Sequence, residues 1–183
     1  MSLQPESEVL FIGGRSGVGK SAAALELHAL LSRHKIRHAV IEGDNLDLAY
    51  PAPWQEPSPW PQGLAAVNLA AMWRNYRALG YRRLIYTNTV AVRETAELSA
   101  AMGDSPRVHA VLLRASDGCA GVRLASRESG STLQEHVVRS RAAAAALDRD
   151  TPGWVHRIDT DTSSAAVVAA RLLDLTGWAG QGS

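Results

Sequence analysis

The chain reads Gly14-Arg15-Ser16-Gly17-Val18-Gly19-Lys20-Ser21 and so matches the pattern G-x-x-x-x-G-K-[ST] at every fixed position. An apolar run at 9–12 precedes this stretch, and a run rich in alanine and leucine at 21–27 follows it. A phosphate-binding loop requires this order of strand, glycine-rich turn and helix. The stretch therefore predicts a site for a nucleoside triphosphate.

Each residue type in the loop has a chemical reason to be there. Glycines adopt the positive φ angles that turn successive backbone N–H groups toward an anion, and the helix that follows adds the positive end of its dipole. Lys20 is expected to be exposed toward the β- and γ-phosphates and to pack against nothing else, while the Ser21 hydroxyl is expected to ligate Mg²⁺. The alternative is a glycine turn that only joins a strand to a helix. We favour the nucleotide site because only two of the 19 basic residues are lysines, so a chance lysine in this position is rare.

Composition limits the classes of protein that this chain can represent. A length of 183 residues fits one domain, which we expect to span residues 1–183. The 19 basic and 18 acidic residues balance, which argues against a nucleic-acid or membrane partner. Cys119 is the only cysteine, and no stretch is long and apolar enough for a signal sequence or a membrane span. We therefore expect a soluble, cytoplasmic protein.

Apolar runs alternate with helical patterns along the chain. Strands are predicted at 8–12, 37–42, 82–88, 108–113 and 154–159, and helices at 20–33, 63–79, 93–101, 116–127, 132–148 and 163–175. A proline-rich segment at 51–61 interrupts the pattern and is expected to be irregular. This alternation is typical of an α/β fold in which helices cover both faces of a parallel sheet, giving three α/β/α layers.

Two carboxylates, Glu42 and Asp44, follow the second predicted strand, at the edge where open parallel sheets bind ligands. One can serve metal-bound water while the other hydrogen-bonds to an acceptor hydroxyl or takes its proton. Asp44 is the better candidate for general base or acceptor anchor. The alternative is that Asp44 only stabilises its own turn.

Arginines flank a small polar break at 128–131. Arg123 and Arg127 lie four residues apart on one helix face, and Arg139 and Arg141 follow the break. The guanidinium fork suits phosphate oxygens. We therefore predict a hinged lid over about 116–148 in which Arg123 and Arg127 supply catalytic charge. The alternative is an ordinary solvated helix face.

Together these residues resemble the small P-loop kinases. The likeness covers most of the chain in order, through the loop, Glu42-x-Asp44, Arg123-x-x-x-Arg127 and Leu133-x-x-His136-x-x-Arg139-Ser140. The nearest groups are the adenylylsulfate, gluconate and shikimate kinases, chloramphenicol phosphotransferase and the TmrB-like tunicamycin-resistance proteins.

The resemblance implies a P-loop NTPase fold with five parallel strands in the order 2-3-1-4-5, ATP and Mg²⁺ as cofactors, and phosphates clamped by the lid arginines. It also implies that Arg157, Asp159 and Asp161, in and after the last strand, lie beside the adenine. A helix N-cap is an alternative role for the turn at 159–162.

The third predicted strand departs from the pattern because it ends Tyr86-Thr87-Asn88-Thr89, without the aspartate of a second nucleotide motif. Metal ligands beyond Ser21 must then come from Glu42, Asp44 or water, and we assign Glu42. Asn88 and Arg93, just past this strand, are candidates for acceptor contact.

Trp54 and Trp60 lie in the proline-rich segment, where the acceptor is expected to enter. Two indoles among prolines make a stiff apolar platform that suits a ring, a nucleobase or an acyl chain. The alternative is that they pack this segment onto the domain.

The leading functional hypothesis is an ATP-dependent phosphotransferase for a small organic hydroxyl compound, with an antibiotic as one candidate. A second hypothesis is a nucleotide or nucleoside kinase. A third is a non-enzymatic switch, or a resistance protein that sequesters its ligand.

Overall fold

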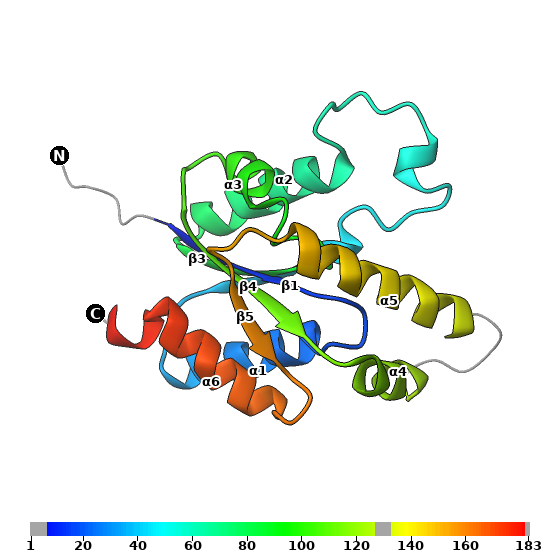
Figure 1. Cartoon of the computed structure of the whole chain (residues 1–183). Helices are drawn as coiled ribbons and strands as arrows, with labels where there is room; N and C mark the ends of the chain where they lie inside the picture. Colours follow the sequence, from blue (N-terminus) through cyan, green and yellow to red (C-terminus); the bar gives the residue numbers. More distant parts are fainter. Residues whose placement is uncertain (1–6, 127–132, 182–183) are drawn as a thin grey trace.

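Five parallel strands form one sheet in the order β2-β3-β1-β4-β5, as predicted (Figure 1). The computed structural model describes residues 7–126 and 133–181. The strands are β1 (Glu8–Gly13), β2 (Ala39–Glu42), β3 (Arg83–Thr87), β4 (Arg107–Arg114) and β5 (His156–Asp159). β1 is buried along its whole length between β3 and β4. Such a central strand, buried on both faces, needs the continuous apolar run that the sequence supplies.

Helices cover both faces of the sheet, which gives the expected three layers (Figure 1). One face packs on α1 (Lys20–Arg33) and α6 (Ala165–Thr176). The other packs on α2 (Leu64–Ala78), α3 (Thr95–Met102) and α5 (Leu133–Asp150). The short helix α4 (Asp117–Ala125) follows β4 at the carboxyl edge and contacts α5. This edge also carries the loop after β1, so the fold gathers the predicted site there.

Element boundaries differ from the predicted ones by at most two residues, and α1 matches at both ends. β2 begins at Ala39 because its pairing with β3 begins at Ala39 opposite Leu84. The preceding Arg37 instead lies over the Tyr81 ring, 5.0 Å from its centroid, and donates to the Leu79 carbonyl at 2.6 Å. Only the neighbouring strand decides where pairing begins, so the boundary is not encoded in the apolar run.

The segment between β2 and α2 is irregular, as its prolines predicted. It contains two short 3₁₀ turns, η1 (Gly43–Asn45) and η2 (Pro53–Gln55), and Figure 1 shows it standing away from the sheet. The last helix is followed by η3 (Trp178–Gln181), whose Trp178 is buried in the α1/α6 core. None of the helices in the described ranges combines the length and apolar character needed to cross a bilayer.

Candidate functional site

The phosphate loop joins β1 to α1 and is held in place by backbone that packs against it. Gly14 and Gly17 have φ angles of +144° and +82°. A Cβ atom at Gly14 would lie 2.6 Å from the Leu113 carbonyl oxygen, and one at Gly17 would lie 2.6 Å from the Ala120 carbonyl oxygen. Conformation and close packing both require glycine here. The end of β4 and the helix α4 therefore fix the shape of the loop.

Lys20 begins α1 but is buried, with 9% of its surface exposed. Its Nζ donates to the Gly14 carbonyl at 2.8 Å and lies 3.4 Å from the Arg15 carbonyl. The expectation that Lys20 is exposed and packs against nothing is therefore wrong, because the ammonium lies back across the loop and bonds to its carbonyls. Ser21, in the first turn of α1, is half-buried.

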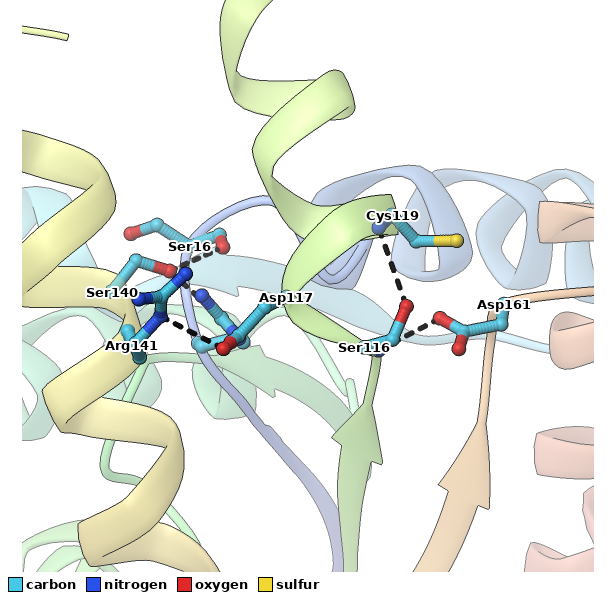
Figure 2. A network of polar contacts seen from close by, with 8 residues as sticks. Ser16, Ser116, Asp117, Cys119, Ser140, Arg141 and Asp161 are labelled. Atoms are coloured by element: carbon cyan, nitrogen blue, oxygen red, sulfur yellow. Dashed lines mark hydrogen bonds and ion pairs between the residues drawn. The ribbon is translucent and has the colours of Figure 1, made fainter. Parts of the chain in front are cut away.

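A polar network ties the loop to both helices of the predicted lid (Figure 2). Arg15, only 3% exposed, donates through Nε to Ser140 Oγ at 2.9 Å and through Nη1 to Asp117. Ser140 Oγ donates in turn to the Ser16 carbonyl at 2.9 Å. The opposite oxygen of Asp117 pairs with Arg141 Nε at 2.8 Å. The loop, α4 and α5 thus form one connected unit.

Asp117 is the acidic centre of this network. The hydrogen bond from Arg15 holds the pKa of Asp117 below its ordinary value, and Arg141 adds to the effect. The sequence analysis missed Asp117, because an aspartate in the first turn of a helix is common, and it named Ser140 only as part of the resemblance, without a role. Only the packing of α5 against the loop reveals them.

Arg123 points toward the backbone of the loop. Its Nη2 donates to the Thr160 carbonyl at 2.7 Å, and its Nη1 donates to Thr160 Oγ1 at 3.0 Å and to the Val18 carbonyl at 3.3 Å. The Thr160 hydroxyl lies 3.0 Å from the same Val18 carbonyl, to which it can donate. A role of Arg123 at the phosphates would require these bonds to be exchanged, and it stays a prediction. Arg127, its predicted companion, lies outside the described residues.

The other lid arginines differ in their surroundings. Arg141 is held beside the loop by Asp117, although 65% of its side chain is exposed. Arg139, one turn from His136 on α5, is exposed. Of the two arginines that follow the break, Arg141 is therefore the one held beside the loop, through Asp117.

A cavity of about 320 Å³ opens beside the loop and the first turn of α1. Its walls include Gly19, Arg123, Thr160 and Ser163. This volume lies within the range of about 300–1,000 Å³ that is common for small-molecule sites. The turn after β5 therefore lines a ligand-sized space next to the phosphate loop.

Of the three residues expected near adenine, two lie in or next to that turn. Asp161 Oδ1 accepts from the Ser116 amide at 2.9 Å, and this bond holds the pKa of Asp161 below its ordinary value. Asp159 forms a two-point pair with Arg114 at 2.9 and 3.1 Å. Arg157 differs from the expectation, because it donates to the Thr151 and Val155 carbonyls before β5, on the side away from the loop.

On the acceptor side, Asp44 meets the chain that follows β3. Asp44 Oδ1 accepts from the Thr89 amide at 3.2 Å, and the Thr89 carbonyl accepts from the Gly14 amide at 3.1 Å. The turn around Asp44 is closed separately, by a backbone bond from Leu46 to Gly43 at 3.0 Å. Asp44 thus ties two sheet-edge loops together and does more than stabilise its own turn.

The remaining predicted acceptor and metal residues divide into two groups. Glu42 is exposed at the end of β2, opposite Thr87, and Asn88 Oδ1 accepts from the Val90 amide at 2.8 Å beside it. Arg93 instead turns toward the end of α5, where its Nη2 lies 3.8 Å from Asp150. The structure therefore brings Asn88 to the acidic edge and directs Arg93 away from it.

The tryptophans do not pack their segment onto the domain. Trp54 and Trp60 are 78% and 41% exposed. Leu48 and Tyr50, in the same segment, are also exposed. Four large apolar side chains in one irregular segment leave open the predicted role as a platform for a ligand.

No model of a known protein family matches the sequence, and no match is found among curated proteins. Solved structures do match over nearly the whole chain. The tunicamycin resistance protein of Deinococcus radiodurans is 21% identical with a TM-score of 0.61, covering 93% of this chain and 96% of that one. The APS kinase of Mycobacterium tuberculosis, in complex with AMPPNP and APS, is 19% identical with a TM-score of 0.58, covering 94% and 99%.

This is the fold of the small P-loop kinases. The shikimate kinase of Acinetobacter baumannii, in complex with shikimate, also matches, at 15% identity and a TM-score of 0.55, covering 99% of this chain and 98% of that one. The resemblance seen in the sequence and the predicted fold class are therefore confirmed. Identities this low establish the fold, while the activity must be argued from the site.

Proposed function

We propose that the protein transfers the γ-phosphoryl group of ATP to a hydroxyl of a small organic acceptor. The observation that carries this proposal is the linkage of Asp44 to the phosphate loop through Thr89, at 3.2 and 3.1 Å. A carboxylate tied to the first glycine of the loop is suitably placed to act on an acceptor that approaches bound phosphate.

The nucleotide would occupy two adjoining regions. Its phosphates would be wrapped by residues 14–21, with Lys20 exchanging the Gly14 and Arg15 carbonyls for phosphate oxygens. Its adenine would fill the 320 Å³ cavity bounded by Arg123 and Thr160, beside the turn that carries Asp159 and Asp161. As the lid closes, Arg141 would supply positive charge to the phosphates. Arg123 would do so as well, once it exchanges its bonds to Thr160 and Val18 for bonds to phosphate oxygens.

Mg²⁺ fits the oxygen groups at this edge. The Ser21 hydroxyl and the exposed Glu42 carboxylate are hard oxygen donors of the kind that Mg²⁺ prefers, with water completing the shell. When bound, the ion would offset negative charge on the transferring phosphoryl group. ATP and Mg²⁺ are both available in the cytoplasm, where we also place the protein.

The proposed transfer is a direct displacement at the γ-phosphorus of ATP. The acceptor oxygen attacks the γ-phosphorus while its proton passes to Asp44, and the bond from the γ-phosphorus to the β–γ bridging oxygen breaks. ADP leaves with the electrons of that bond. Trp54, Trp60 and Asn88 would hold the acceptor in line, and an antibiotic is one candidate acceptor.

Mass spectrometry of a panel of hydroxyl compounds incubated with ATP and Mg²⁺ tests the proposal. A product heavier by one phosphoryl group is expected from the wild type and should be lost in Asp44→Asn. Stoichiometric binding of an acceptor without transfer would support sequestration instead. Nucleotide-dependent binding of a protein partner, without an acceptor, would support a switch.

A further inference from the structure

Tyr86 is the fourth residue of β3, one residue before the carboxyl end of that strand. Its side chain is 1% exposed, and its ring packs edge-on against Phe11 with centroids 5.6 Å apart. In the sheet it lies beside Ile41 of β2. The ring therefore belongs to the core.

The hydroxyl lies against the backbone of Gly43. A Cβ atom on Gly43 would come within 2.3 Å of Tyr86 Oη. Gly43 is not among the glycines with positive φ, so its backbone conformation does not demand glycine. The steric demand comes from Tyr86, whose oxygen reaches the acidic edge between Glu42 and Asp44.

This hydroxyl has no hydrogen-bond partner among residues 7–126 and 133–181. Within those ranges, the Tyr86 oxygen is not closed off from solvent, so it has access to the surface. The partner left for this hydroxyl is solvent, which a ligand can replace. The oxygen is therefore available to a ligand that contacts the acidic edge.

The surroundings of the hydroxyl are negatively charged. Burial raises the pKa of Tyr86 above its ordinary value, and the nearby carboxylates of Asp44, Glu94 and Asp47 raise it further. Burial likewise raises the pKa of Glu94, with Glu97 and Asp47 adding to the effect and Arg93 opposing it. Both groups are thus pushed toward their neutral forms.

Arg93, which opposes the rise in the pKa of Glu94, turns toward Asp150, 3.8 Å from its Nη2. An anionic acceptor would have to leave water and approach several carboxylates, which is costly. A cation would gain from the same carboxylates, and a neutral hydroxyl compound would offer Tyr86 a hydrogen bond without repulsion.

We infer that the Tyr86 hydroxyl and the carboxylates of Asp44, Asp47 and Glu94 form the acceptor subsite, and that this subsite selects neutral or cationic hydroxyl compounds over carboxylates and phosphate esters. This inference rests on the proposed phosphotransferase function. Within that function it argues against nucleoside monophosphates as acceptors.

The test uses two sets of compounds matched in size and differing in charge. One set is tryptophol, tryptophanol and indole-3-lactate, and the other is glucose, glucosamine and gluconate. Equilibrium binding is measured with the nucleotide site filled by AMPPNP, so that binding is read without transfer. The neutral or cationic member of at least one set should bind about tenfold tighter than its anionic member.

Variants then assign the selectivity to residues. Tyr86→Phe should weaken the preferred compound about 5- to 10-fold with the AMPPNP affinity unchanged, the effect expected for one lost hydrogen bond. Glu94→Gln should reduce the preference for the cation. Tyr76→Phe, which removes a hydroxyl from α2 in the same core layer, is the matched control and should change nothing.

Tighter binding of the anionic members, absence of binding by every compound, or unchanged affinity in Tyr86→Phe would overturn the inference. A folding defect is not expected to obscure the result, because Tyr86→Phe keeps the ring; thermal unfolding should confirm that it is at least as stable as the wild type. Incubation with ATP and Mg²⁺ decides the proposed function separately. Binding with the expected charge preference but no phosphorylated product would refute the transferase and leave the subsite assignment standing.

Discussion

Thr160 is the point at which the phosphate loop, α4 and the turn after β5 are joined, and Thr160→Val isolates that junction. Threonine is 3% exposed, and valine has nearly the same shape, so the change removes a hydroxyl without making a cavity. The change removes the bond from Arg123 Nη1 at 3.0 Å and the contacts of the hydroxyl with the Val18 and Arg114 carbonyls at 3.0 and 3.1 Å. Arg123 keeps its bonds to the Thr160 and Val18 carbonyls.

The expected cost follows from these remaining bonds. Arg123 and the Val18 carbonyl each keep a hydrogen bond, and the Arg114 carbonyl still accepts from the Thr160 amide at 2.8 Å. We therefore expect a loss of about 1–2 kcal/mol in the free energy of unfolding. For a chain of this size that corresponds to a fall in Tm of about 2–8 °C. ADP should bind up to about tenfold more weakly, because Arg123 is held less firmly along the cavity that we propose for adenine.

Calorimetry and equilibrium binding of ADP measure both effects. Thr162→Val is the matched control, because Thr162 is an exposed threonine in the same turn and should change Tm by less than a degree or so. If Thr160→Val unfolds and binds ADP like this control, the junction does not hold the loop and the proposed adenine cavity together.

Three further outcomes are expected. Lys20→Met should keep the fold, because the apolar stem is retained, but lower transfer by about 10²-fold or more in an ATP turnover assay; a change within threefold would remove the loop from nucleotide chemistry. Asp44→Asn should slow transfer with little change in ATP affinity, whereas Glu42→Gln should weaken the dependence on Mg²⁺; loss of ATP binding in Asp44→Asn would assign Asp44 to the nucleotide. Burial holds the pKa of His38 below its ordinary value of 6.5, so protonation favours the unfolded chain. The Tm should therefore fall between pH 7.5 and pH 5.5, and by less in His38→Gln; equal falls would exclude His38 as the cause.

The lid is tested by hydrogen exchange with and without AMPPNP. The helices α4 and α5 should gain protection on binding, since closure would add contacts to the Arg15 and Asp117 network. Arg141→Gln should reduce transfer more than it reduces nucleotide affinity. Identical exchange in both states, with wild-type activity in Arg141→Gln, would contradict a closing lid.

Much of the fold follows from local sequence. The loop at 14–21 needs particular residue types at particular spacings, because φ angles, anion contacts and the start of a helix all act within eight residues. The apolar runs likewise predict which strands are buried on both faces, and β1 is buried along its whole length. The strand order came from the resemblance, which the structure confirms.

The chemistry of individual side chains depended on partners far away in sequence. Arg15 is an unspecified position of the loop motif, yet it is buried because Ser140 and Asp117, more than a hundred residues away, supply its partners. Arg123 matched a phosphate-clamping pattern, but the turn after β5 engages it in this structure.

Tyr86 shows most plainly which properties follow from local sequence and which depend on tertiary packing. Its apolar neighbours in β3 predict a core residue, and its ring is one. Its hydroxyl reaches the acidic edge only because β2 pairs alongside β3 and is followed by a glycine, Gly43, which leaves room for the oxygen. Periodicity encodes burial, which is a property of the local pattern, whereas side-chain partners depend on which elements pack together. The sequence by itself therefore determined the phosphate loop and the layered sheet, and only the tertiary structure decided which side chains meet around them.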